Sequence, residues 1–267
     1  MLRDACDCHM HVYEPGYPIA ATAVSAPPPG LLSDYLAVRA RLGLTRAVVV
    51  QPTAYGADNS CTLAAMAALG SVARGVAMVT GEEADGELER LAQAGITGFR
   101  FRTFPGGVLG WKDLDRMAAR SQEFGWHTDI EMDGRTLPEH EAAIARLPGT
   151  LVIDHVGKFL EPVPLDHPGV KVLLRLIEGG RAYVKITSLY DSSRSGPPEY
   201  RDLAPLVALL VRTAPERLIW ATNWPHAALA PDQRPDDAAW LDLMSEWMDA
   251  ATRHKMLVDN PATLHGF

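Results

Sequence analysis

The stretch Asp7-Cys8-His9-Met10-His11, near the start of the chain, has the pattern of a short β-strand that carries two histidines on one face. Side chains alternate between the two faces of a strand, so Asp7, His9 and His11 are predicted to point one way and Cys8 and Met10 the other. Two imidazoles on one face can bind a metal ion, carry protons or hold a charged substrate. The competing interpretation is a pair of buried histidines that make purely structural hydrogen bonds.

Seven further apolar, β-rich segments follow at intervals of roughly 25–35 residues, and helix-compatible stretches separate them. The eight predicted strands cover residues 5–13, 47–52, 74–79, 98–102, 127–132, 151–156, 181–187 and 218–223. The eight predicted helices cover residues 33–42, 60–70, 85–94, 113–124, 137–146, 170–178, 200–212 and 236–249. This alternation predicts an α/β fold, a (β/α)8 TIM barrel, in one domain of residues 1–267. A doubly wound open sheet is the alternative if one strand is missed.

The composition is that of a globular protein with an acidic charge balance. The chain has 267 residues, of which 47% are hydrophobic and 22% are charged, and its formal net charge is −8. That charge argues against nucleic acid or an anionic membrane as a partner, and no apolar run approaches the roughly 20 residues of a membrane span. Cys6, Cys8 and Cys61 are odd in number and lack Cys-x-x-Cys spacing, which predicts reduced thiols in a cytoplasmic protein. Whether the chain forms a homo-oligomer is left open.

Polar residues follow nearly every predicted strand, at the carboxyl-terminal mouth where barrels of this kind build their active sites. The set comprises His9, His11, Tyr55, Arg100, Arg102, Glu131, His155, Lys158, Tyr190, Arg194, Asn223 and His226. Because several of them are cations in an acidic chain, they predict a pocket for a small anion, most simply a carboxylate held by arginine. Asp129 and Glu131 have a competing structural interpretation, in which they neutralise Arg100, Arg102 or Lys185 inside the barrel.

Three segments of the chain resemble the amidohydrolase superfamily, in the branch of 2-pyrone-4,6-dicarboxylate lactonases, 4-sulfomuconolactone hydrolases and D-galactarolactone isomerases. They are His9-Met10-His11, Ile153-Asp154-His155-Val156-Gly157-Lys158-Phe159 and Thr222-Asn223-Trp224-Pro225-His226. The resemblance runs nearly end to end, as far as Asp259-Asn260-Pro261. It implies a distorted barrel and acyl chemistry, with a small anionic lactone or its ring-opened acid as the partner.

The resemblance also implies roles for individual residues, by position. His9, His11 and His155 match the histidines of the catalytic site, and Arg100 matches an arginine that holds the substrate carboxylate. Glu131 falls at a position that varies among relatives and is expected to tune which substrate is accepted. The other residues expected to contact substrate are Arg102, Lys158, Tyr55, Tyr190, Arg194 and His226.

Asn223 is where the chain departs from the lactonases, which have aspartate at this position. An asparagine cannot act as a general base, so Asn223 is expected to orient a water, a lactone oxygen or a histidine, and pH dependence near neutrality should come from histidine. The isomerase type shares the asparagine but lacks the histidine at the position of His9, so this chain combines features of both. An engineered Asp→Asn change is an alternative origin of Asn223.

Because Asn223 stands where the carboxylate of the eighth strand would be, the sequence also indicates whether a metal cofactor is bound. The superfamily pattern uses that carboxylate as a ligand, so we expect a site without a metal cofactor. The alternative is one Zn²⁺ ion bound by His9, His11 and His155.

Three functions remain open from the sequence. The first is a lactonase-type hydrolase, in which an activated water attacks the carbonyl of a small carboxylated lactone. The second is an intramolecular lactone isomerase of the D-galactarolactone type, in which a substrate hydroxyl replaces the water. The third is a non-catalytic protein that binds a sugar acid.

Overall fold

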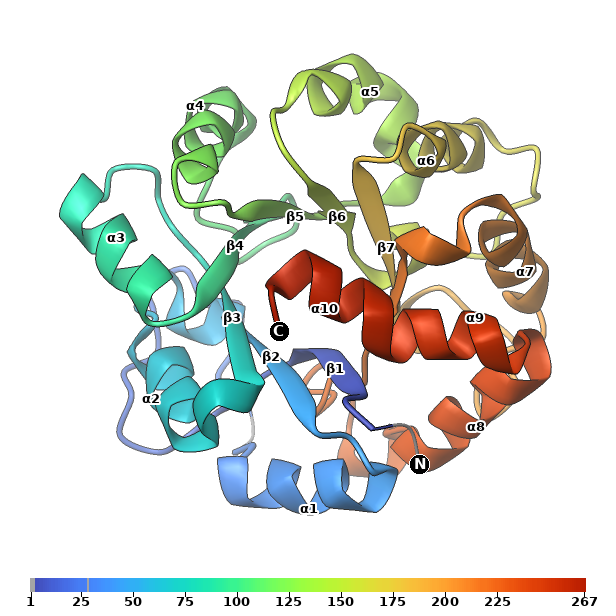
Figure 1. Ribbon diagram of the computed structural model, residues 1–267, viewed down its shortest axis with the longest axis horizontal. Coiled ribbons are helices and arrows are strands. Elements are labelled where there is room, and N and C mark those ends of the chain that lie inside the picture. The colour runs from blue at the N-terminus through green and yellow to red at the C-terminus, as the bar shows by residue number, and fades with distance from the viewer. Residues whose placement is uncertain (1–2, 28) are drawn as a thin grey trace.

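The computed structural model describes residues 3–27 and 29–267, and eight parallel strands form its single sheet in the order β1 to β8 (Figure 1). The strands are β1 (Cys6–Met10), β2 (Arg46–Val50), β3 (Ala73–Ala77), β4 (Ile96–Arg102), β5 (His127–Glu131), β6 (Leu151–Ile153), β7 (Ala182–Ile186) and β8 (Leu218–Trp220). The ring closes beyond the end of β8. The backbone N–H of Asn223 donates to the His9 carbonyl at 2.8 Å, and that of His11 donates to the Trp224 carbonyl at 2.8 Å. The predicted TIM barrel is confirmed.

Helices α1 to α8 surround the strands on the outer side of the barrel, and α10 crosses one end of it (Figure 1). They are α1 (Leu32–Leu42), α2 (Ser60–Leu69), α3 (Asp85–Gln93), α4 (Trp111–Gln122), α5 (Leu137–Arg146), α6 (Pro168–Glu178), α7 (Ala204–Thr213), α8 (Asp237–Trp247), α9 (Ala250–His254) and α10 (Asn260–His265). Apolar residues on their inner faces pack against outward-facing strand residues, as Tyr35 of α1 and Met117 of α4 do, and this packing forms the main core. In the described part of the chain, no helix is long and apolar enough to cross a membrane.

Strand β1 does not alternate as the sequence predicts, because it contains a β-bulge. Between Asp7 and Met10 it has one residue more than its partner β2. Asp7 therefore points away from the barrel interior, where its carboxylate accepts hydrogen bonds from Tyr35 Oη at 3.1 Å and Thr222 Oγ1 at 2.7 Å. Cys8 instead packs inside the barrel with valines of the neighbouring strands. The predicted orientations of Asp7 and Cys8 are wrong, whereas His9 and His11 still share the interior.

The chain beyond residue 249 forms two short helices that the sequence did not predict. Figure 1 shows α10 crossing the amino-terminal end of the barrel. Leu264 and Phe267 pack against the apolar cluster inside the barrel, and Arg74 Nε donates to the His265 carbonyl at 3.1 Å. This segment covers the amino-terminal opening of the barrel.

Strands β6 and β8 are shorter than predicted because the chain turns sharply where each one ends. His155 has φ +54° and Asn223 has φ +64°, values in the left-handed region that few side chains adopt. Lys158 and Ser188, in the loops after β6 and β7, share this conformation. Strained backbone of this kind is concentrated at functional sites, where it re-aims side chains.

Candidate active site

A cavity of about 360 Å³ opens at the carboxyl-terminal mouth of the barrel. The predicted site residues that line it are His11, Arg100, Arg102, Glu131, His155, Lys158, Tyr190 and Asn223. Tyr13, Thr53, Phe104 and Asp191 also line it and were not in the predicted set. Two of these could have been found from the sequence, because Tyr13 continues the alternation of His9 and His11, and Asp191 follows Tyr190.

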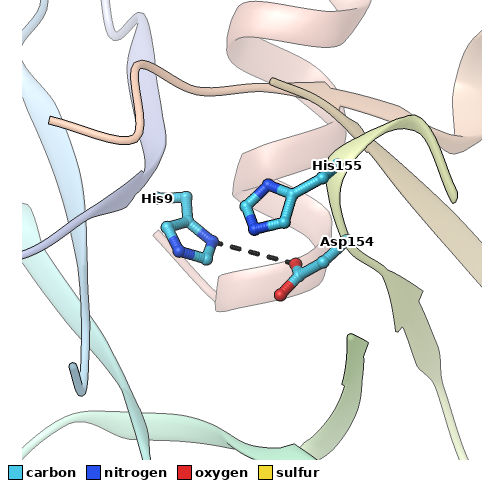
Figure 2. Close-up of side chains that lie close together, drawn as sticks. All are labelled: His9, Asp154 and His155. Atoms are coloured by element: carbon cyan, nitrogen blue, oxygen red, sulfur yellow. Dashed lines mark ion pairs between the residues drawn. The ribbon is translucent and has the colours of Figure 1, made fainter. Parts of the chain in front are cut away.

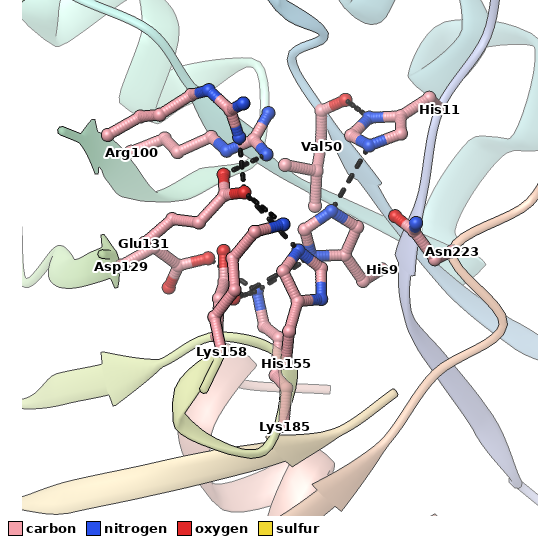
Figure 3. A network of polar contacts seen from close by, with 12 residues as sticks. His9, His11, Val50, Arg100, Asp129, Glu131, His155, Lys158, Lys185 and Asn223 are labelled. Atoms are coloured by element: carbon pink, nitrogen blue, oxygen red, sulfur yellow. Dashed lines mark hydrogen bonds and ion pairs between the residues drawn. The ribbon is translucent and has the colours of Figure 1, made fainter. Parts of the chain in front are cut away.

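Glu131 is the centre of a charged cluster on one wall of the cavity (Figure 3). Its buried carboxylate accepts from Arg100 Nη2 at 2.5 Å and from Arg102 Nη1, and it pairs with Lys158 Nζ at 2.9 Å. Burial alone would raise the pKa of Glu131, but the three neighbouring cations outweigh burial and hold that pKa well below its usual range. Lys158 Nζ also pairs with Asp191 at 2.7 Å. The wall therefore carries three positive and two negative side chains, a balance of one positive charge.

His9 and His11 form a hydrogen-bonded pair whose proton positions follow from their partners (Figure 3). His11 Nδ1 lies 2.7 Å from the Val50 carbonyl, which can only accept, so Nδ1 carries the proton of the neutral ring. His11 Nε2 is then an acceptor, and His9 Nε2, 3.2 Å away, is the donor. His9 Nδ1 in turn accepts from Lys185 Nζ at 3.3 Å. Both rings use their lone pairs within the protein, so neither is a free base.

Among His9, His11 and His155, only His155 has a ring nitrogen without a hydrogen-bond partner in the described residues. It lines the cavity, and its buried Nδ1 has no hydrogen-bond partner among the described residues. Its Nε2 lies 3.8 Å from a carboxylate oxygen of Glu131. Burial and the nearby Lys158 ammonium lower the pKa of His155 well below its usual range, so the ring is neutral at pH 7. A neutral imidazole with an unused lone pair can accept a proton from a nucleophile.

Asn223 is held by a chain of side chains that ends at a carboxylate. His226 Nε2 lies 3.1 Å from Asp237, and the Tyr190 hydroxyl lies 3.3 Å from His226 Nδ1. With Nε2 as the donor to Asp237, Nδ1 accepts from Tyr190, whose hydroxyl oxygen accepts from Asn223 Nδ2 at 2.7 Å. The remaining Asn223 oxygen is buried and without a partner in the described residues. Asn223 thus contacts Tyr190 through its side chain and His9 only through its backbone.

Four of the residues predicted for the site are not among the described residues that line the cavity. His9 lies beneath His11, fully buried, and His226 acts on the cavity only through Tyr190. Tyr55 packs against Tyr13, and its hydroxyl donates to a backbone carbonyl at 3.1 Å. The side chain of Arg194 is 74% exposed and pairs with Glu161 at 2.6 Å, outside the cavity.

The family follows from comparison with known proteins. A family model described as Amidohydrolase matches residues 6–267. The chain belongs to the amidohydrolase family.

This amidohydrolase is 35% identical to the D-galactarolactone isomerase of Agrobacterium fabrum, over 98% of this chain and 91% of that protein. It is 33% identical to the 4-sulfomuconolactone hydrolase of Rhizobium radiobacter, over 99% of this chain and 90% of that protein. The apo crystal structure of an Agrobacterium tumefaciens protein matches with a TM-score of 0.93 at 34% identity, covering 100% of this chain and 97% of that one. These matches confirm the family that the sequence resembles. The curated relatives are enzymes, and they give no support to a non-catalytic binding protein.

Three side chains of the amidohydrolase could offer ligands to a metal ion. His9, Asp154 and His155 each have one donor atom, and these atoms lie within 4.8 Å of one another (Figure 2). Lys185 Nζ lies in the same space, 3.1 Å from Asp154 Oδ1 and 3.3 Å from His9 Nδ1. Two of the three candidate ligands, His9 and Asp154, therefore already contact a positive charge, and in this arrangement they do not fit a divalent cation.

The pKa values lead to a prediction about pH. Burial is the main cause that lowers the pKa of His9 and of His11, the latter to about 3, and it does the same for His155. A group with a lowered pKa stays neutral until the pH falls towards that value, so kcat should be flat between about pH 6 and 8. The sequence predicts histidine titration near neutrality, whereas the lowered pKa values place this titration in the acid range.

The measurement is kcat against pH for the wild type and for Asn223→Asp. A carboxylate at residue 223 favours protonated imidazole, so it should shift the acidic limb of the variant to higher pH. A wild-type limb centred near the ordinary histidine pKa of about 6.5 would contradict the account.

Proposed function

We propose that this amidohydrolase rearranges a small lactone that carries one carboxylate, by moving the acyl group between two oxygens of the substrate. The observation that carries the proposal is a set of unused polar atoms in cavity-lining residues. Arg100 Nε, His155 Nδ1 and Asn223 Oδ1 are buried and have no partner among the described residues. Because a buried polar atom without a partner costs free energy, a ligand that supplies its hydrogen bonds is favoured.

These three atoms suit the parts of a hydroxylated lactone acid. Arg100 offers a donor from a guanidinium whose other nitrogens already donate to the Gln51 carbonyl and to Glu131. Such a donor suits a carboxylate or a lactone carbonyl. Asn223 offers an acceptor, which suits a substrate hydroxyl. His155 offers a lone pair for the proton of that hydroxyl.

In the proposed reaction, His155 takes the proton from a substrate hydroxyl as its oxygen attacks the lactone carbonyl. Lys158 on the cavity wall stabilises the oxyanion that develops, while Arg100 holds the substrate carboxylate. The original ring C–O bond then breaks, and its oxygen receives the proton from His155. No atom is gained or lost.

Isomerisation is favoured over hydrolysis, which the sequence alone placed first. An attacking water would need a base to position and deprotonate it, and Asn223 cannot serve as that base. A hydroxyl within the substrate has a high effective concentration, so it requires less of the base. Hydrolysis remains the second candidate, because the free Nδ1 of His155 could also accept a proton from water.

The proposal is tested by following a panel of lactones with proton NMR. The panel contains polyhydroxylated lactones with one carboxylate, lactones with two acidic groups, and uncharged lactones of the same ring sizes. We expect rearrangement of members of the first group only. Turnover that is equally fast for the uncharged lactones, or absent for every carboxylated one, would contradict the proposal.

The charge balance of the cavity wall gives a second prediction. One net positive charge suits one substrate carboxylate, and Glu131→Gln raises the balance by one unit. The variant should therefore improve kcat/KM for lactones with two acidic groups, relative to those with one, by about tenfold, which corresponds to about 1.4 kcal/mol.

The matched control is Glu161→Gln, because Glu161 pairs with Arg135 and Arg194 outside the cavity. It should leave the ratio of the two kcat/KM values unchanged. If Glu131→Gln also leaves the ratio unchanged, Glu131 does not select substrates by charge.

A further inference from the structure

Lys185 is a fully buried lysine at the base of the site, on β7. Its ammonium donates to Asp129, lies 3.1 Å from Asp154 Oδ1 and lies 3.3 Å from His9 Nδ1 (Figure 3). Lysine is almost never fully buried unless it is paired. Here every neighbour named is a carboxylate or a ring nitrogen that accepts, which is the environment of a bound cation.

The charge of Lys185 is required by its surroundings. The carboxylates of Asp129 and Asp154 are both fully buried, and removing a partner from buried charges leaves them uncompensated. Burial by itself would lower the pKa of Lys185, but these two carboxylates outweigh burial and raise it. The ammonium therefore stays charged at neutral pH.

The same ammonium fixes the direction of the hydrogen bonds in the histidine pair. The Val50 carbonyl and the Lys185 ammonium stand at the two ends of the pair, one able only to accept and the other only to donate. His9 must then be protonated on Nε2 and His11 on Nδ1. A metal ion bound to His9 Nδ1 would need the position where Lys185 donates.

We propose that the Lys185 ammonium replaces a metal ion as the bound cation of this barrel. It takes the place that a divalent metal ion would have among His9, Asp154 and His155, and it sets the tautomers of the histidine pair. This inference goes beyond the proposed function, because it holds for any substrate. Its tests measure metal content and protonation without turnover, so its failure and the failure of the proposed function are distinguishable.

The first test is zinc binding by the full chain and by Lys185→Met. Methionine has a similar length and no charge, so the variant leaves two carboxylates beside two imidazoles, the donor types that bind zinc. After dialysis against micromolar zinc and then buffer, elemental analysis should find about one zinc ion per variant chain and almost none in the wild type. Cobalt in place of zinc should give the variant visible absorption bands.

Two matched variants test whether zinc binding depends on the charge at residue 185 and not on the loss of any lysine. Lys185→Arg keeps a cation at the site, and Lys158→Met removes a lysine whose partners are Glu131 and Asp191, not the partners of Lys185. Both should remain free of metal. Lys185→Met combined with Asp129→Asn removes one uncompensated carboxylate, which keeps the test available if the single variant does not fold.

Stoichiometric zinc in the wild type would overturn the proposal, and so would metal-free Lys185→Met, judged on the single variant or, if that variant does not fold, on the double variant. The second test is nitrogen-15 NMR of the histidine rings in the wild type. We expect His9 protonated on Nε2 and His11 on Nδ1, with the His9 signals displaced in Lys185→Arg. His9 protonated on Nδ1 would overturn the assignment of Lys185 as its donor.

Discussion

Replacing His155 with asparagine is expected to lower kcat by about 10²–10⁴-fold while KM changes little. His155 lines the cavity and its Nδ1 has no partner among the described residues, whereas the lone pairs of the His9 and His11 rings are engaged. Asparagine is chosen because residue 155 has φ +54°, a conformation that asparagine tolerates better than most residues. Steady-state kinetics on the preferred lactone measures the effect, and the melting temperature reports whether the fold is kept.

The matched control is His254→Asn. His254 is 45% exposed, pairs with Asp259 and lies outside the cavity-lining set, so its loss should leave kcat unchanged. If His155→Asn retains more than about a tenth of the wild-type kcat, general base catalysis by His155 is excluded, because that role contributes about a hundredfold or more.

Arg100→Met is expected to raise KM for a carboxylated lactone by about 30- to 1000-fold. The reason is the loss of a charge-assisted hydrogen bond in a buried site, which is worth about 2–4 kcal/mol. Arg102 and Lys158 still neutralise Glu131 in this variant, so the cavity wall keeps its fold. The measurement is KM for one carboxylated lactone and for its uncharged amide or ester.

The uncharged analogue is the internal control, because it has no carboxylate for Arg100 to hold. Its KM should change little in Arg100→Met. An equal increase for both compounds would mean that Arg100 shapes the cavity without recognising a carboxylate.

The barrel was predictable from the sequence because eight apolar segments recur at a spacing that fits strand, helix and turn. Local irregularities were not. The bulge in β1 inserts one residue, and because side chains alternate with a period of two, that insertion reversed the predicted orientation of Asp7 and Cys8. The short C-terminal helices were missed because their packing against the barrel interior, through Leu264 and Phe267, is a long-range contact.

The candidate site was predictable as a set of residues and less so as a set of contacts. Strand ends converge at the mouth of any such barrel, so Arg100, Glu131 and His155 were expected to lie together. Which partner each residue takes depends on side-chain geometry that no spacing encodes. Arg194 reaches away to Glu161, and Lys185 lies between two buried carboxylates.

The central claim is that the barrel rearranges a carboxylated lactone without a metal ion. It is tested most directly by mass spectrometry of the product that chelator-treated protein forms in water enriched in oxygen-18. Internal acyl transfer takes no atom from water, so the account predicts an isomeric lactone without the label, formed at the rate of untreated protein. A labelled ring-opened acid as the main product, or turnover that returns only when zinc is added, would contradict it.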